Sequence, residues 1–179
     1  MAEVEIRPAV STDIQVLEGF DHTCETTHVW QLESSLAQDH YSIDLKEIRL
    51  PRVLRLNYPR RSETLKDSWN QHTLFLVARC EDNLVGYLIL DENPDLRSAV
   101  IRDLVVDVPM RHQGIATALI LAAQEWIKRR GITRLVLEIP TKNHPMIELA
   151  RKLRFEFSGL VDNYYANRDI VFYFVHLLK

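Results

Sequence analysis

Cysteine and long apolar runs are both scarce in this sequence of 179 residues. The two cysteines, Cys24 and Cys80, cannot build a disulfide framework and match no metal-ligand spacing. No apolar run approaches the ~20 residues that span a bilayer, and no charged-then-apolar leader opens the chain. The seven histidines are scattered and suggest no metal site. These absences predict a cytoplasmic protein without membrane attachment or a bound metal.

Positive charge is also in short supply. The formal net charge is −3, whereas a general affinity for nucleic acid needs a basic surface. Five arginines between Arg49 and Arg61 form the one local basic cluster, which indicates either a solvated edge or loop or a cradle for an anionic ligand. Apolar residues make up 46% of the chain and charged residues 26%, as in ordinary globular proteins. The length fits one domain spanning residues 1–179.

The first 70 residues are the less readable part. Glu3–Pro8 alternates as a strand does, and Ser11 to Asp13 can cap a helix running to about Phe20. Beyond Asp21 the pattern is mixed. We expect a helix around His28–Gln38 and extended segments around Tyr41–Leu56.

From about residue 71 the pattern of strands and helices is clear. Two strands joined by a short polar turn predict a hairpin, and further strands alternate with two amphipathic helices. The predicted order is strands Thr73–Cys80, Leu84–Leu90 and Ala99–Val108, helix Gly114–Arg130, strand Arg134–Ile139, helix His144–Leu153, and an antiparallel pair Phe155–Leu160 and Ile170–Leu178. This order predicts an α/β (α+β) fold, in which helices pack on a mixed central sheet.

One segment has the features of a phosphate site. A β-branched strand ending at Val108 runs into a polar loop, and a helix then begins at Gly114 followed by small residues. A helix N-terminus offers unpaired N–H groups to an anion, and glycine with Ala116 lets a diphosphate approach the backbone. Arg111 adds a nearby cation. The alternative is a strand-to-helix turn that binds nothing, and neither the P-loop nor the dinucleotide fingerprint occurs.

The run from Arg111 to Ala116 resembles the [R/Q]-x-x-G-x-[G/A] signature of the GNAT acetyltransferase superfamily. The similarity continues through the following helix, Leu137-Glu138, Asn143 and Phe155, and it covers the chain from about residue 73 onward. It implies a single-domain GNAT fold with acetyl-CoA as cosubstrate, in which residues 71–179 bind acetyl-CoA and residues 1–70 face the acceptor.

The resemblance also implies roles for particular residues. Backbone N–H groups of the loop and helix start would hold the CoA diphosphate, and Asn143 would contact the cofactor arm. The strand before the loop would pair with pantetheine, with the N–H of Val106 stabilising the oxyanion. This strand and the one bearing Leu137 would splay to admit the thioester. The expected cofactor-binding residues are Leu104, Val105, Val106, Val108, Arg111, His112, Gln113, Gly114, Ile115, Ala116, Thr117 and Asn143.

Two acidic residues are candidates for the general base. Glu138 shares a strand face with Val136, and a carboxylate there is costly unless it is paired or functional. It either removes a proton from the amine, through water, or is a salt-bridged or amine-binding residue that moves no proton. Asp103 shares the base role or binds the acceptor's cation, or else it only hydrogen-bonds a neighbouring loop.

The general acid is the weak point of the resemblance. The family's usual tyrosine corresponds to Ala150 here, and its usual glycine near the helix end is replaced by Arg154. Tyr164 and Tyr165 are possible substitutes, with packing at the rim as the alternative role. A non-catalytic acyl-CoA sensor or a weak thioester hydrolase therefore stays open.

The acceptor is expected to be a primary amine of a small molecule. Phe20-Asp21, Trp30 and Gly159–Asp162 resemble the streptothricin acetyltransferase branch more loosely, and scattered carboxylates would favour a cationic acceptor. A protein N-terminal or lysine acetyltransferase is the alternative. A homodimer is possible if the apolar strand Ile170–Leu178 lies at a sheet edge, although helices of the same chain would cover it equally well.

Overall fold

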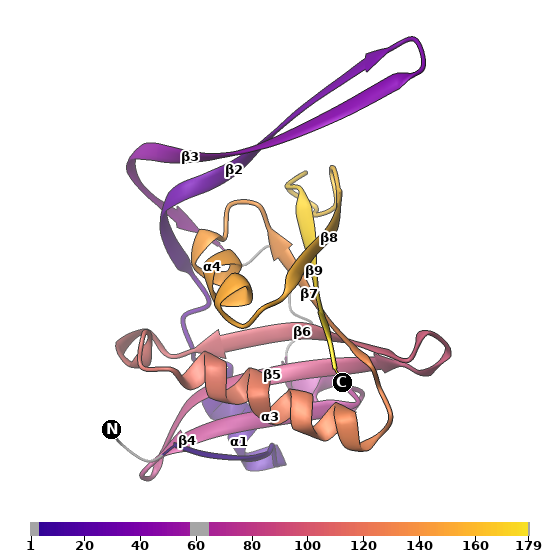
Figure 1. Cartoon of the computed structure of the whole chain (residues 1–179). Coiled ribbons are helices and arrows are strands. Elements are labelled where there is room, and N and C mark those ends of the chain that lie inside the picture. Colours follow the sequence, from indigo (N-terminus) through magenta and orange to yellow (C-terminus); the bar gives the residue numbers. More distant parts are fainter. Residues whose placement is uncertain (1–3, 58–64, 179) are drawn as a thin grey trace.

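The computed structural model describes residues 4–57 and 65–178, which form one seven-stranded sheet and a separate two-stranded arm (Figure 1). The strand order in the large sheet is β1-β4-β5-β6-β7-β9-β8, and every neighbouring pair is antiparallel except β6–β7. The strands are β1 (Val4–Pro8), β4 (Leu74–Cys80), β5 (Asn83–Asn93), β6 (Ser98–Val106), β7 (Arg134–Pro140), β8 (Glu156–Val161) and β9 (Val171–Leu177). The predicted mixed sheet and α/β class are confirmed.

Helices cover both faces of this sheet. The helices are α1 (Ser11–Leu17), α2 (Leu65–Ser68), α3 (Ile115–Arg129) and α4 (His144–Lys152), with short 3-10 turns η1 (Pro94–Leu96) and η2 (Val108–Met110). The larger core lies between the sheet and the α3–α4 layer and includes Leu88, Leu119 and Ile147. A smaller core on the opposite face joins α1 and α2 to Tyr87 and Ile89 of β5.

Helix α3 begins and ends at the expected glycines. Gly114 has φ +87° and Gly131 has φ +74°, a region that costs other residues ~1–2 kcal/mol. The inner face of α3 consists of Ile115 and Leu119 and, further along, of the fully buried Ile120, Ala123 and Ile127, whereas Ala122 and Trp126 are partly exposed.

The parallel pairing of β6 with β7 ends before the strands do. Their ladder runs from Ser98 opposite Arg134 to Ile101 opposite Leu137, although β6 continues to Val106 and β7 to Pro140. Figure 1 shows β7 and its neighbours turning away from β6 beyond this point. The splayed strand pair expected from the resemblance is therefore present.

The segment predicted as a helix at His28–Gln38 is instead a strand. Strands β2 (Cys24–Ala37) and β3 (His40–Leu56) form a long hairpin, so the expected extended structure over Tyr41–Leu56 is confirmed and the helix is wrong. Val29, Leu32 and Leu36 follow helical spacing, but Trp30, Leu32 and Leu36 also lie on one face of a strand. Pairing with β3 decides between the two periods, as tertiary contacts often do for short apolar patterns.

We call the whole β2–β3 hairpin the arm. Its base is attached to the carboxyl-terminal half of the chain. The N–H of Trp30 donates to the carbonyl oxygen of Thr141 at 3.0 Å, and its indole ring packs edge-on against Phe172. The Arg151 guanidinium lies 4.9 Å from the same indole. Beyond this base the arm projects away from the body (Figure 1).

The carboxyl-terminal strands differ from expectation in their order. The antiparallel pair β8–β9 is confirmed, but β9 inserts between β7 and β8 and is not an edge strand. The proposed dimer contact through Ile170–Leu178 is therefore wrong. Alternate residues of β9, including Phe172 and Phe174, are buried in the core, which explains its central position.

Helix α1 is held at its start by Asp13 rather than by Ser11. The Asp13 carboxylate accepts hydrogen bonds from the Val10 N–H at 2.8 Å and from both terminal nitrogens of Arg7 at 2.7 and 2.9 Å. Its side chain is 8% exposed. The hydrogen bond from Arg7 outweighs burial and lowers the pKa of Asp13.

We predict that Asp13→Asn reduces the free energy of unfolding by ~1–3 kcal/mol at neutral pH. Because the folded-state pKa lies below the unfolded value of ~3.9, the stabilisation is complete above that value and is lost as the pH falls through the folded pKa. Urea denaturation should therefore show a gap between variant and wild type that shrinks below pH ~4. The control Asp82→Asn removes an exposed ion pair with Arg79 and should change little. Equal effects of the two substitutions would contradict this account.

Candidate active site

The gap between β6 and β7 exposes backbone groups of β6. On its other side β6 pairs with β5, where the N–H of Asp107 donates to the carbonyl oxygen of Val85 at 3.0 Å. Hydrogen-bonding direction alternates along an antiparallel strand, so the amides of Val106 and Leu104 point away from β5 into the gap. The carbonyl oxygen of Val106 accepts from Nε of Arg111 at 3.0 Å, which agrees with this direction.

A cleft of about 80 Å³ lies in this gap. Its walls come from both splayed strands, from the start of α4 and from the loop between β8 and β9. The lining residues include Leu104, Leu137, Glu138, Asn143, Met146 and Tyr165. Glu138 and Tyr165, which were predicted to be catalytic, therefore line the same cleft as Leu104 and Asn143, which were predicted to bind the cofactor.

The loop from β6 to α3 has the shape expected of a phosphate site. His112 has φ +63° and Gly114 φ +87°, and no atom lies within 4 Å of the position that a Gly114 Cβ would take. Gln113 is tied back to the carbonyl oxygen of Pro109 at 3.2 Å. The N-terminal turn of α3, with Ile115, Ala116 and Thr117, follows directly. Val108 differs from prediction because β6 ends at Val106 and Val108 lies in η2.

The Arg111 side chain does not supply the expected cation to this loop. Its guanidinium donates to three carbonyl oxygens: Val106 at 3.0 Å, Thr23 at 2.7 Å and Asp21 at 2.7 Å. These bonds hold the segment before β2 against the end of β6. The backbone N–H of Arg111 donates to the carbonyl oxygen of Val108 at 3.3 Å, so the predicted contact with a diphosphate would come from the N–H groups that follow it.

A β-bulge places two charged residues on one face of β6. Ile89 pairs with Asp103 and Leu90 with Ile101, so Arg102 is the extra residue. Ile101 and Leu104 belong to the core under α3. Both Arg102 and Asp103 therefore point to the opposite face of the sheet, as in a classic bulge.

An ion-pair network crosses the gap on that face. The Arg102 guanidinium lies 3.1 Å from Asp91 and 3.7 Å from Glu138, and the Tyr164 hydroxyl donates to Glu138 at 3.2 Å. Burial opposes ionisation of Asp91, but His72 and Arg102 outweigh it and lower its pKa. The Glu138 side chain is 8% exposed. It is held in place by groups from β6 and from the loop 162–169.

The two loop tyrosines occupy different positions. Tyr164 is exposed and contacts Glu138, whereas Tyr165 is buried and lines the cleft. Ala150, at the position of the family's usual tyrosine, is fully buried in the core. Tyr165 thus brings a phenol to the cleft from a different element.

A larger polar hollow of about 200 Å³ adjoins the cleft, since Pro140 and Asn143 line both. The Asn143 side chain caps α4 by accepting from the Met146 N–H at 3.2 Å, and it also lies 3.5 Å from the Cys24 sulfur. Burial raises the pKa of Cys24, which disfavours a thiolate nucleophile. The remaining lining residues come from the arm base and two loops: His22, Arg55, Leu56, Asn57, Lys142, Asn167 and Asp169.

His22 links the hollow to the sheet. Its Nε2 lies 3.3 Å from the hydroxyl of the buried Tyr87, and its neighbours are the chain segment fixed by Arg111. Burial lowers the pKa of His22 against the opposing charge of Asp103, so the imidazole is neutral at pH 7. Burial and Asp103 raise the pKa of Tyr87. The predicted residue Asp103 therefore faces a histidine and a tyrosine at the edge of the site.

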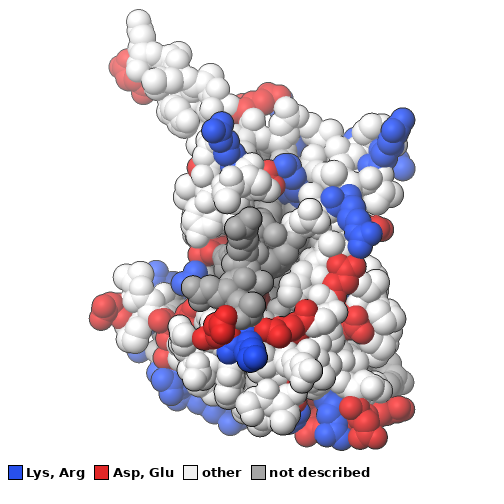
Figure 2. Space-filling view, turned by 180° about the vertical axis from the view of Figure 1, so that it is seen from behind, with Lys and Arg blue, Asp and Glu red and all other residues white. Residues whose placement is uncertain are grey.

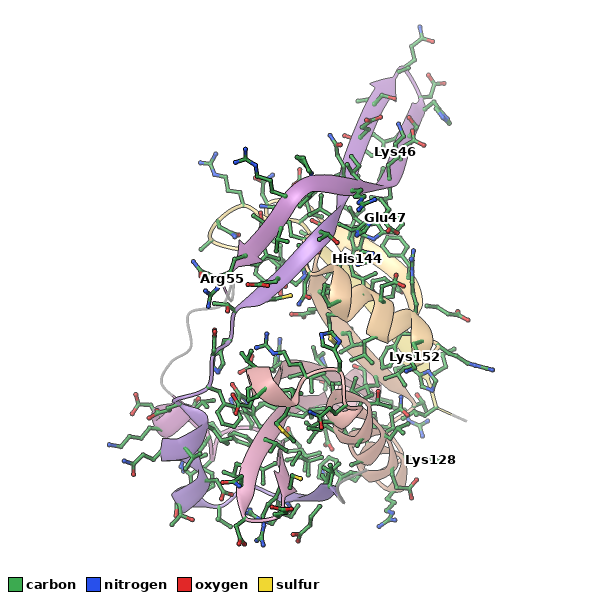
Figure 3. The ribbon with its side chains drawn as sticks, turned by 90° about the vertical axis from the view of Figure 1, so that its left-hand side faces the viewer. Lys46, Glu47, Arg55, Lys128, His144 and Lys152 are labelled. Carbon is green, nitrogen blue, oxygen red and sulfur yellow. The ribbon has the colours of Figure 1, made fainter. Side chains whose placement is uncertain are left out.

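One group of metal-type ligands occurs among the described residues. Ligand atoms of Glu47, His144 and Glu148 lie within 4.8 Å of one another. The Glu47 carboxylate is 3.1 Å from His144, and Arg151 approaches both glutamates at 3.9 and 3.0 Å. Figure 3 shows Glu47 on the arm above His144 at the start of α4. The arginine balances the acidic charge, so the group acts here as an ionic contact between arm and body.

Sequence reasoning missed several residues of the site. No sequence motif marks Arg102, His22 or Tyr87. A β-bulge brings Arg102 to Glu138, and packing between distant segments brings His22 and Tyr87 near Asp103. Of the basic cluster, Arg55 reaches the hollow, whereas Arg60 and Arg61 lie outside the described residues. Within the described ranges no helix is long and apolar enough to cross a membrane.

Two curated proteins are similar to this chain over different lengths. A candidate ribosomal protein bS18-alanine N-acetyltransferase of Bacillus subtilis is 28% identical over 102 residues, which is 55% of this chain and 64% of that protein. The streptothricin acetyltransferase of Streptomyces lavendulae is 24% identical over 161 residues, covering 87% of this chain and 83% of that protein. The chain thus spans under two thirds of the first relative and most of the second.

Solved structures share the whole fold. A nourseothricin acetyltransferase has a TM-score of 0.84 at 22% identity, covering 98% of this chain and 99% of that one. A candidate streptothricin acetyltransferase from Bacillus anthracis, solved with acetyl coenzyme A, has a TM-score of 0.77 at 17% identity, covering 98% and 100%. The model of the acetyltransferase (GNAT) family matches residues 37–155, two thirds of the sequence. The chain therefore belongs to the GNAT family of acetyl-CoA-dependent acetyltransferases.

Proposed function

We propose that this protein transfers the acetyl group of acetyl-CoA to a primary amine of a small cationic molecule, directly within a ternary complex. The observation that carries this proposal is the position of Glu138. Its carboxylate lines the cleft between the two splayed strands, opposite the strand whose Val106 N–H points into the same gap. A base that lines the cleft and an oxyanion donor on the strand across the gap would suit acyl transfer.

The cofactor would bind mainly through the backbone. Its diphosphate would contact the N–H groups at Gly114 and the first turn of α3, where the αL glycine leaves open space. The β6–β7 pairing ends at Ile101 and Leu137, and the pantetheine chain of the cofactor would continue it by pairing with Leu104 and Val106. The thioester would then lie in the cleft next to Glu138.

The reaction needs three things from the protein. The amine nitrogen must be uncharged when it attacks the thioester carbon, so Glu138 accepts its proton, directly or through water. The N–H of Val106 stabilises the oxyanion of the tetrahedral intermediate. When the C–S bond breaks, the departing thiolate takes a proton, and the buried phenol of Tyr165 in the cleft is the best-placed donor. Tyr164 holds Glu138 by its hydrogen bond.

The acceptor would enter from the face opposite α3, through the polar hollow. This face of the sheet carries Asp91, Asp103 and Glu138 near the cleft, which favours a cationic amine. The hollow holds about 200 Å³, a size that suits part of a small molecule. The S. lavendulae relative named for streptothricin acetylation supports the same class of acceptor.

A binding titration followed by a turnover assay tests this proposal. Acetyl-CoA should bind in calorimetry, and CoA thiol should then appear only when a suitable amine is added. The amine panel should include a streptothricin, a polyamine and a peptide with a free N-terminal alanine. Turnover of the peptide alone would favour a protein acetyltransferase, and binding without turnover of any amine would favour an acyl-CoA sensor.

We predict that Gly114→Trp abolishes acetyl-CoA binding while the protein still folds. The indole would fill the open space beside Gly114 that the diphosphate is expected to use. Gly131→Trp is a matched control, because Gly131 also has positive φ and open space but ends the same helix. Both variants should lose similar stability, ~1–2 kcal/mol from the left-handed conformation, yet only the first should lose binding in calorimetry. Unchanged affinity in Gly114→Trp would refute the diphosphate site.

We predict that Glu138→Gln lowers kcat by about 10²–10⁴-fold with little change in acetyl-CoA affinity, because the amide cannot accept the proton. It should also remove the acidic limb of the pH–rate profile. Glu125→Gln, which changes an exposed residue of α3, should behave like wild type. If Glu138→Gln leaves the pH–rate profile unaltered, the base is Asp103 or water.

A further inference from the structure

The short segment between α1 and β2 is fixed to the end of β6 by one side chain. All three nitrogen atoms of the Arg111 guanidinium donate hydrogen bonds to backbone carbonyl oxygens. The two terminal nitrogens donate to Asp21 and Thr23, each at 2.7 Å, and so hold the chain on both sides of His22. Nε donates to Val106 at 3.0 Å. One arginine therefore joins the segment that leads into the arm to the strand that faces the gap.

The contact with Val106 lies where β6 has lost its neighbour. The ladder between β6 and β7 ends earlier, at Ile101, and Arg111 donates to the carbonyl oxygen of Val106 beyond that point. The same peptide group is held from the other side, because the N–H of Asp107 donates to Val85 of β5 at 3.0 Å. Bonds from a charged donor are stronger than neutral ones. The end of β6 is therefore a fixed support for the segment before β2.

A second arginine holds the same segment from the arm. Arg55 of β3 donates to the Asp21 carboxylate at 3.0 Å and to the Thr23 hydroxyl at 3.2 Å, and Figure 3 shows it at the lower end of the arm. Its side chain is exposed, so these contacts are weak in water, whereas two of the three Arg111 bonds are partly buried. On the face shown in Figure 2 the described acidic and basic side chains are intermingled, which favours individual contacts over a broad field of one sign.

The segment held in this way forms one wall of the polar hollow. His22 and Cys24 both line the hollow. Nε2 of His22 lies 3.3 Å from the Tyr87 hydroxyl, and the Cys24 sulfur lies 3.5 Å from Oδ1 of Asn143, which also lines the cleft. A shift of the segment would therefore move this wall relative to both β6 and the cleft. A misplacement of about 1 Å at such a site can cost a reaction about 100-fold.

We propose that Arg111 is a positioning residue of the acceptor site, which holds the wall of the hollow at a fixed distance from the strand that bears Val106. This inference rests on the proposed acetyltransferase activity, because the hollow is where we place the acceptor. The place of Arg111 in the sequence signature indicates a cation for the cofactor, whereas its three bonds are directed to the acceptor side. Loss of this side chain should therefore impair binding of the acceptor and spare acetyl-CoA.

Steady-state kinetics with a streptothricin and calorimetry with acetyl-CoA test this assignment. Arg111→Gln should raise KM for the streptothricin about 10–100-fold, with a smaller change in kcat and little change in acetyl-CoA affinity, because the wall that binds the acceptor is displaced. Arg111→Lys keeps the charge without the planar fork. It should show the same pattern at a smaller size, and it takes the place of the glutamine variant if that variant does not fold.

The control is Arg129→Gln, which removes an exposed ion pair with Glu125 on α3 and should behave like wild type. A marked loss of acetyl-CoA affinity in Arg111→Gln, with KM for the streptothricin unchanged, overturns the proposal and assigns the side chain to the cofactor.

Alkylation of Cys24 by iodoacetamide tests the same assignment without turnover. Burial raises the pKa of the Cys24 thiol and the charge of Arg111 opposes this, so loss of the charge alone would slow alkylation. Release of the segment would instead expose the sulfur. Arg111→Gln should therefore speed alkylation of Cys24 at least about fivefold, measured by mass spectrometry to separate it from the buried Cys80.

An unchanged or slower alkylation rate overturns the proposal, whether or not any amine is acetylated. Faster alkylation in a protein that acetylates no amine of the panel would support the role of Arg111 in holding the wall and would contradict only the proposed acetyltransferase activity. The two failures are therefore distinguishable.

Discussion

The loss of pairing between β6 and β7 after Ile101 and Leu137 is the constraint on which the site depends. A strand buried in a sheet normally pairs on both sides, and an unpaired buried backbone group costs about 1–3 kcal/mol. The structure meets part of this cost itself, since Arg111 donates to the carbonyl oxygen of Val106. The N–H groups of Leu104 and Val106 face the gap, so the proposed pairing with the extended amide chain of the cofactor would complete the sheet there.

The β-bulge at Arg102 comes directly after the last residue of β6 that pairs with β7. The extra residue turns two consecutive charged side chains to the acceptor face, and Arg102 then reaches across the gap to Glu138 while also pairing with Asp91. The contact with Glu138 is the longer of the two, and the arginine is 40% exposed. A cationic acceptor can therefore compete for Glu138 without removing Arg102 from Asp91. The network holds the carboxylate in place before the acceptor arrives.

The carboxyl-terminal half of the fold was predictable because its signals are local. Gly114 and Gly131 mark the helix α3, and alternation with Leu135 and Leu137 marks β7, so Glu138 could be placed from its neighbours alone. The arm could not be predicted in the same way. Its apolar spacing fits a helix and a strand, and only pairing with a distant segment selects the strand. His22 and Arg102 were missed for a related reason, since packing and a bulge, rather than a motif, bring them to the site.

The arm extends from the hollow to a tip that projects away from the body (Figure 1). Its base supplies Cys24, Arg55, Leu56 and Asn57 to the wall of the hollow, and its outer half carries exposed apolar side chains. Both strands run without interruption of the chain between these two regions, although the pairing shifts between Thr26 and His28. Glu47 and Trp30 fasten the ribbon to α4 and the β7–α4 loop between them. The loop before α3 is joined to the same wall, because Arg111 of that loop donates to the carbonyl oxygens of Asp21 and Thr23 directly before β2.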